Sequence, residues 1–146
     1  MEFVVKKFNE LSIQELYAIL QLRSEVFVVE QDCVYQDIDY KDQKAFHVLG
    51  IKEEKIIAYA RIFNSGNYFS KPSIGRIIVK ENQRKYKYGF QLVSTSIQYI
   101  EDNFIEKTIL ISAQTYLTKF YNSLGFIQQG EGYLEDGIPH IKMLRN

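Results

Sequence analysis

The 146-residue sequence has few of the features that mark secreted, membrane or multi-domain proteins. Its single cysteine, Cys33, cannot form an internal disulfide, which suits a reducing compartment. No stretch approaches the roughly 18 consecutive apolar residues that a membrane-spanning helix needs. The N-terminal stretch MEFVVKKFNE also lacks the apolar region of a signal peptide. We therefore expect a cytoplasmic protein that does not engage a membrane.

The sequence also has no excess of charge, because 18 basic and 18 acidic residues give a formal net charge of zero. Nucleic acids and anionic lipids attract strongly basic proteins, so neither is an expected partner. Proline is scarce, and there is no repeat or low-complexity tract. With 46% hydrophobic residues the chain is able to build a core, and we expect one domain over residues 1–146.

The hydrophobic periodicity predicts alternating strands and helices. Residues 3–8 form a first strand, and Ser12 with Glu15 forms a capping box that begins a helix ending near residues 27–29. Residues 30–44 are polar and acidic, and are predicted to form a loop or short helix. Further strands are expected at 45–51, 55–63, 74–79, 108–112, 126–130 and 138–144, and further helices at 89–104 and 117–124. This order predicts an α/β fold with a mixed sheet and helices on both faces.

The stretch from Ile74 to Leu92 is the most informative part of the chain. An apolar strand leads into a turn with four cations, Lys80, Arg84, Lys85 and Lys87, and then into a helix. A helix N-terminus presents unpaired N–H groups and a positive dipole end, so this order predicts a phosphate site. Neither the Walker nor the Rossmann glycine pattern is present. The alternative is a solvated basic turn.

Four segments resemble the GNAT acyltransferases, which bind acetyl-coenzyme A. Arg84-x-x-Lys87-x-Gly89 resembles their Q/R-x-x-G-x-G/A pyrophosphate loop, with Lys87 in place of the first glycine. The stretch 120–126, FYNSLGF, resembles their F-Y-x-x-x-G-F element. The stretches LRSEVFVVEQ (22–31) and YLEDGIPHIKM (133–143) resemble the ElaA-type branch of the superfamily. The resemblance covers nearly the whole chain and implies a GNAT-like, mostly antiparallel sheet.

The resemblance also implies a coenzyme site. The pyrophosphate of acetyl-coenzyme A would lie over six consecutive residues, Arg84, Lys85, Tyr86, Lys87, Tyr88 and Gly89. The pantetheine arm would follow the strand residues Ile77, Ile78 and Val79, one of which would offer a backbone N–H to the thioester carbonyl. Asn122 is a further predicted contact. The lysine at position 87 either blocks the close backbone approach that glycine allows or adds a cation.

Tyr121 is the predicted catalytic residue, because the resemblance places its hydroxyl near the coenzyme sulfur. A phenol with a pKa of about 10 is able to protonate a leaving thiolate. The alternative is a tyrosine that packs in the core and bonds a backbone group.

The residues that would serve the acceptor are less well defined. Glu30, Gln31 and His140 are the predicted substrate residues. The base that removes a proton from the amine stays open among eight side chains: Glu25, Glu30, Asp37, Asp39, His47, Glu131, Glu135 and His140. The acidic stretch Asp37-x-Asp39-x-x-Asp42 lacks the glycine and final glutamate of an EF-hand. It is interpreted as a polar loop that attracts a basic acceptor, and no metal is expected.

The predicted function is transfer of an acetyl group from acetyl-coenzyme A to an amine by direct attack in a ternary complex. The amine is a small molecule, a peptide N-terminus or a lysine side chain. The alternative, which the unusual Lys87 motivates, is a non-catalytic module on the same fold that binds coenzyme A or another ligand. The oligomeric state stays open, a homodimer included.

Overall fold

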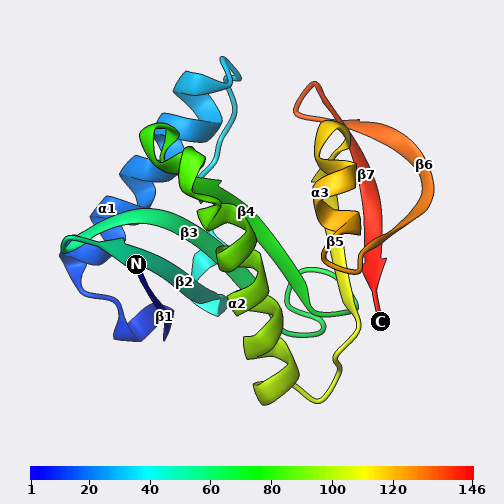
Figure 1. Ribbon diagram of the computed structural model, residues 1–146, viewed down its shortest axis with the longest axis horizontal. Helices are drawn as coiled ribbons and strands as arrows, with labels where there is room; N and C mark the ends of the chain where they lie inside the picture. The colour runs from blue at the N-terminus through cyan, green and yellow to red at the C-terminus, as the bar shows by residue number, and fades with distance from the viewer.

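The computed structural model describes residues 1–146 and places the first four strands in one antiparallel sheet (Figure 1). These strands are β1 (Glu2–Lys7), β2 (Phe46–Lys52), β3 (Lys55–Phe63) and β4 (Ser73–Val79), in the order β1-β2-β3-β4. Glu53 and Glu54 both have positive φ, at 52° and 65°. Two positive φ values are what a type I′ turn needs, and the predicted hairpin of β2 and β3 is confirmed.

The remaining strands form a second antiparallel sheet. Its members are β5 (Ile109–Gln114), β6 (Ile127–Glu135) and β7 (Ile138–Arg145), in the order β5-β7-β6. Asp136 and Gly137 form the tight turn between β6 and β7 that the sequence predicts, with φ of 52° and 77°. Strand β6 is longer than the predicted 126–130 because it continues past an irregularity between Gln129 and Tyr133.

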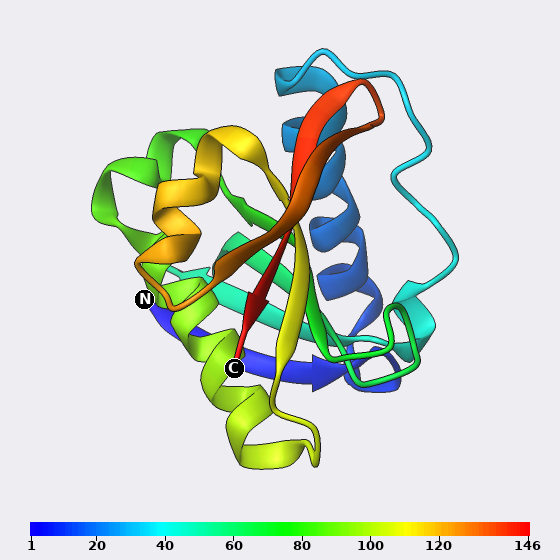
Figure 2. The ribbon, with the colours of Figure 1, turned by 90° about the vertical axis from the view of Figure 1, so that its right-hand side faces the viewer.

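Helices cover both faces of the first sheet, as predicted (Figure 2). Helix α1 (Ile13–Arg23) begins at the capping box of Ser12 and Glu15 and continues as a π-helix over Ser24–Glu30. Its buried side chains pack with Leu49, Tyr59 and Ile78 of the sheet. Helix α2 (Tyr88–Asn103) packs against the opposite face, and the short helix α3 (Thr118–Asn122) follows β5. None of these helices combines the length and the hydropathy that a membrane-spanning segment requires.

The two sheets meet at one end of β4 and β5 and then separate. The backbone N–H of Leu110 donates to the carbonyl of Pro72 at 2.9 Å, but β4 and β5 share no strand ladder. A bulge interrupts β4, where Arg76 has φ of 49° and the pairing with β3 shifts between Tyr59 and Arg61. Bulges bend a strand and interrupt its pairing, so β4 diverges from β5 and leaves space between the sheets.

Candidate active site

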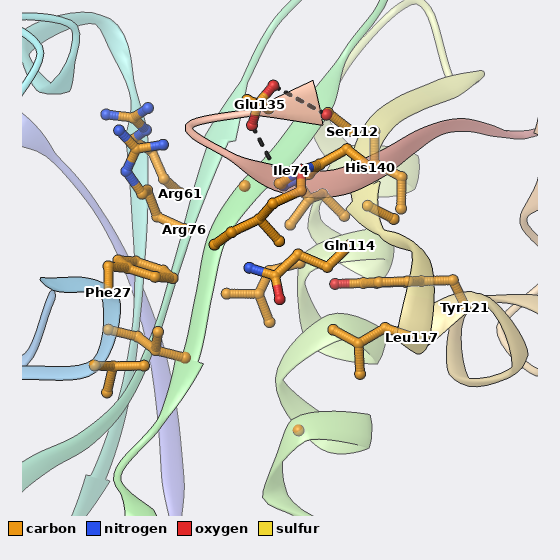
Figure 3. Close-up of a pocket in the computed structure, with 18 of the residues that line it drawn as sticks. Phe27, Arg61, Ile74, Arg76, Ser112, Gln114, Leu117, Tyr121, Glu135 and His140 are labelled. Atoms are coloured by element: carbon orange, nitrogen blue, oxygen red, sulfur yellow. Dashed lines mark hydrogen bonds and ion pairs between the residues drawn. The ribbon is translucent and has the colours of Figure 1, made fainter. Parts of the chain in front are cut away.

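A cavity of about 720 Å³ occupies the space between β4 and β5 (Figure 3). Its walls come from these two strands, the π-helical end of α1, the first turn of α2, the short helix α3 and the turn between β6 and β7. Segments far apart in the sequence therefore converge on one hollow.

The N-terminus of α2 forms one end of the cavity. Lys87 precedes the helix with φ of 60° and ψ of 27°, the left-handed conformation that glycine adopts most readily. No side chain caps the helix, and its first turn has no acidic residue. Lys87 and Gly89 both line the cavity. Unpaired N–H groups beside a lysine fit a pyrophosphate, and the lysine at position 87 preserves the turn that a glycine would make.

Arg84 lies in the same turn but is already paired. Its Nη1 and Nη2 donate to the Glu30 carboxylate at 2.6 and 2.9 Å, and its Nε donates to the Val79 carbonyl at 2.9 Å. The hydrogen bonds that Arg84 donates to Glu30 raise the pKa of Arg84 above its ordinary value. The predicted phosphate residue and the predicted acceptor residue therefore bind each other at the cavity wall.

The other predicted coenzyme residues divide into two groups. Ile77, Ile78 and Val79 line the cavity from β4. The side chains of Lys85, Tyr86, Tyr88 and Asn122 are not part of the lining. The two tyrosines instead contact Lys52, whose Nζ lies 4.2 and 5.2 Å from their ring centroids.

Tyr121 reaches the cavity from α3. Its ring is 5% exposed and packs edge-on against Phe120 and Phe126, with centroids 5.1 and 5.9 Å away. Figure 3 shows its hydroxyl pointing into the cavity beside Gln114. Burial raises the pKa of Tyr121 well above its usual range, so the hydroxyl keeps its proton at neutral pH. A buried ring with its hydroxyl toward the cavity is suited to donate a proton there.

A polar group lines the wall opposite the α1 side. Ser112 on β5 bonds the hydroxyl of Tyr133 and donates to Glu135 Oε1 at 3.2 Å, both on β6. Glu135 Oε2 lies 3.5 Å from Nε2 of His140 on β7. The sequence placed His140 among the acceptor residues and Glu135 among the candidate bases. The contribution of Ser112 was missed, because a serine in a strand carries no local signal.

A buried network of arginines and aspartates was also missed. Arg23 and Arg61 are each 1% exposed and share Asp42, with both distances 2.8 Å. Asp37 pairs with Arg23 at 2.9 Å and with Arg76 at 2.7 Å. The interpretation of residues 37–42 as a loop that attracts a basic acceptor is therefore wrong at Asp37 and Asp42, which neutralise the chain's own arginines.

His47 is removed from the list of candidate bases by its surroundings. It is fully buried, its Nδ1 lies 2.6 Å from the Tyr59 hydroxyl and its Nε2 lies 3.0 Å from the Asp42 carbonyl. Burial lowers the pKa of His47 and outweighs the opposing hydrogen bond and charge of Asp42, while the charges of Arg23 and Arg61 also lower it. No group of three or more His, Cys, Asp or Glu side chains is arranged to hold a metal ion.

Comparison with known proteins identifies the fold and the family. The family model described as "Acetyltransferase (GNAT) domain" matches residues 7–145. Protein ElaA of Escherichia coli K12 is 48% identical over 139 residues, which cover 94% of this chain and 91% of ElaA. An acyl-CoA N-acyltransferase from Pseudomonas aeruginosa superposes with a TM-score of 0.94 at 36% identity, covering 100% of both chains. The crystal structure of E. coli ElaA gives a TM-score of 0.92 at 45% identity, covering 99% of both.

Acyl-coenzyme A is the substrate that GNAT enzymes share. The predicted fold class, mostly antiparallel strands with helices on both faces, is confirmed by the strand pairing and by these superpositions. The family model matches nearly the whole sequence, and the alignment with ElaA covers nearly the same length. The chain is a member of the GNAT acetyltransferase family.

Proposed function

We propose that this protein transfers an acetyl group from acetyl-coenzyme A to a primary amine while both are bound. The observation that carries the proposal is the extent of one cavity, from the uncapped N-terminus of α2 to the Tyr121 hydroxyl. A coenzyme lying along this cavity would have its phosphates at the N-terminus of α2 and its thioester beside the Tyr121 hydroxyl. The family description supports acetyl as the transferred group.

The coenzyme would be held mainly by backbone groups. Lys87 and Gly89 line the cavity where α2 begins, so N–H groups of the first helical turn would bind the phosphates and the Lys87 ammonium would add a charge. The strand from Ile77 to Val79 follows the bulge of β4, so its backbone is available beside the cavity. Arg84 would contribute indirectly, because its hydrogen bonds to Glu30 and to the carbonyl of Val79 fix the turn before α2.

Acetyl-coenzyme A supplies an activated thioester, and the protein would add position and a proton. Holding amine and thioester together removes much of the entropic barrier to attack. Tyr121 would donate its hydroxyl proton to the departing sulfur, for which its buried ring and cavity-facing hydroxyl are suited. An N–H of Ile77, Ile78 or Val79 would polarise the carbonyl.

Two measurements on one preparation test this function. Isothermal titration calorimetry with acetyl-coenzyme A reports binding, and thiol release on addition of amines reports transfer. We expect saturable binding and thiol release that depends on both amine and enzyme. Binding without release by any primary amine would favour the non-catalytic module. An absence of binding at millimolar acetyl-coenzyme A would contradict both the transferase and a non-catalytic module that binds coenzyme A.

A further inference from the structure

The charges that line the cavity are distributed unevenly. Three arginines in its wall already have carboxylate partners: Arg61 pairs with Asp39 and Asp42, Arg76 with Asp37, and Arg84 with Glu30. The cation without such a partner is Lys87, at the coenzyme end. At the turn of β6 and β7, Glu135 and Asp136 form no ion pair with an arginine or a lysine. That end of the cavity therefore favours a cation and disfavours an acid.

His140 offers a proton acceptor at the same end. Its Nδ1 lies 2.7 Å from the carbonyl of Ile138, and a carbonyl only accepts, so Nδ1 carries the proton of the neutral ring. Nε2 then keeps its lone pair. It is 3.5 Å from Glu135 Oε2, which is longer than a normal hydrogen bond, and the His140 side chain is 8% exposed. A buried imidazole is thus left with one nitrogen free beside a carboxylate.

Three strands hold these two residues in place. Ser112 on β5 donates to Glu135 Oε1 and also bonds Tyr133. Tyr133 lies directly opposite His140 in the β6–β7 ladder, and the two rings stack at 6.2 Å with an interplanar angle of 21°. Figure 3 shows Glu135 joined to its partners at the cavity rim. Groups fixed on strands are positioned more accurately than groups on loops.

We propose that Glu135 and His140 form the site that binds and deprotonates the acceptor, and that the acceptor is a primary amine with an apolar body and no carboxylate. This inference rests on the proposed transferase function. Glu135 binds the ammonium group and His140 Nε2 takes its proton. Aromatic side chains in the wall of the same cavity receive the body of the amine: Phe27, Phe63, Tyr68 and Phe69.

The step balances in atoms and protons. His140 Nε2 takes one proton from the ammonium, and Glu135 stabilises the resulting imidazolium. The freed amine forms the new C–N bond to the acetyl carbonyl as the C–S bond breaks. Tyr121 gives a proton to the sulfur and is reprotonated by the second proton that leaves the nitrogen. The net products are the amide, the thiol and one proton released from His140 to solvent.

The charged and polar groups around His140 come from three strands. From β6 these are Glu135 and the phenol of Tyr133, and from its own strand Lys142, whose Nζ lies over the Phe69 ring at 3.6 Å. The adjacent β5 contributes the uncharged Ser112 and Gln114. Glu135 is thus the carboxylate that faces Nε2, and its removal withdraws the charge that stabilises the imidazolium.

The acceptor class is tested by two amines that share one skeleton. Phenethylamine and phenylalanine differ only in the carboxylate, and both are offered at saturating acetyl-coenzyme A. We expect kcat/KM for phenethylamine to exceed that for phenylalanine by at least tenfold, since a second carboxylate beside Glu135 is repelled. Equal values, or a preference for phenylalanine, would overturn the assigned acceptor class.

The residues are tested by Glu135→Gln and His140→Gln, with Glu2→Gln as the matched control. Glu2 also lies on a strand, β1, but is exposed and outside the cavity lining. We expect E135Q to raise KM for phenethylamine about tenfold, from a lost charge-assisted hydrogen bond. We expect H140Q to lower kcat about a hundredfold, as for loss of a general base. The control is expected to match the wild type.

The pH profile separates catalysis from a structural effect. In the wild type kcat/KM is expected to fall on the acidic side, where Nε2 is protonated and no longer accepts a proton. H140Q should remove that fall while acetyl-coenzyme A binds with unchanged affinity. An unchanged profile in H140Q would overturn the role of His140. Failure of the wild type to bind acetyl-coenzyme A would instead contradict the transferase function itself.

Discussion

Arg84 and Glu30 are joined by two hydrogen bonds, of 2.6 and 2.9 Å, that connect the turn before α2 to the π-helical end of α1. Both side chains are partly exposed, at 42% and 30%. The guanidinium that the sequence assigns to the coenzyme phosphates is thus held by a carboxylate, which itself repels phosphate. The coenzyme must compete with Glu30 for Arg84 or leave this pair intact.

Replacing Glu30 by Gln is expected to strengthen coenzyme binding. The substitution frees Arg84 and removes a negative charge near the phosphates, and exposed ion pairs of this kind contribute up to about 1 kcal/mol. We therefore expect Kd for coenzyme A to fall by up to about fivefold in calorimetry. Glu25→Gln, an exposed neighbour outside the cavity lining, is the control. Weaker binding in Glu30→Gln would show that the pair itself shapes the site.

Lys87 allows charge and backbone conformation to be separated. Lys87→Gly and Lys87→Ala both remove the cation, but only glycine relieves the left-handed strain at φ of 60°. We expect both to weaken coenzyme binding two- to fivefold, as for one exposed charge. The glycine variant should be the more stable of the two by about 1 kcal/mol in thermal unfolding. Tenfold tighter binding by the glycine variant would mean that the lysine obstructs the phosphate site.

Tyr121→Phe tests the proposed proton donor. The hydroxyl points into the cavity while the ring packs in the core, so the variant keeps the packing and loses the proton. We expect kcat to fall on the order of a hundredfold with unchanged coenzyme affinity. Because burial raises the pKa of Tyr121, no loss of rate from its ionisation is expected below about pH 10. Tyr17→Phe, at an exposed position, is the control, and an equal rate in both variants would remove Tyr121 from the mechanism.

The arginine–aspartate network predicts loss of stability in acid. Burial alone would raise the pKa of Asp39, but the hydrogen bonds and charge of Arg61 and the charge of Arg76 lower it to about 2. Asp42 is shifted in the same direction by Arg23 and Arg61 against its burial. A lowered folded-state pKa stabilises the protein above the unfolded value of about 3.9, and this contribution is lost as pH falls towards 2. Denaturant unfolding at pH 6, 4 and 2 should show it.

Asp42→Asn tests the same network directly at neutral pH. Two arginines that are each 1% exposed would lose a shared partner. Breaking a buried ion pair from one side costs about 3–5 kcal/mol. We expect an unfolding free energy lower by that amount, with Asp32→Asn on the same loop as control. A loss below about 1 kcal/mol would mean that Asp37 and Asp39 are sufficient partners for the two arginines.

Much of the fold was predictable because its signals are local. The capping box of Ser12 and Glu15, the strand-turn-helix order around Lys87 and the turn at Asp136–Gly137 depend on neighbouring residues only. These features are confirmed with boundaries shifted by a few residues. The continuation of β6 beyond residue 130 was not predicted, because its glycines at 130 and 132 interrupt the alternation of the strand.

The parts of the site that were not predicted depend on distant residues. Arg23 and Asp42 are 19 residues apart, and Ser112 and Glu135 are 23 apart and lie on different strands. No periodicity indicates that such pairs meet. An acidic loop whose carboxylates pair with buried arginines has the same composition as an acidic loop that is exposed to solvent. The pairing of Arg84 with Glu30, 54 residues away, is hidden for the same reason.

Transfer of a labelled acetyl group tests the central assignment most directly. The protein is mixed with isotope-labelled acetyl-coenzyme A and phenethylamine, and the amide is followed by mass spectrometry with wild type and Tyr121→Phe. We expect labelled N-acetyl product in amounts that match the thiol released, formed on the order of a hundredfold more slowly by the variant. Coenzyme binding without labelled amide from this or any other primary amine would contradict the transferase assignment.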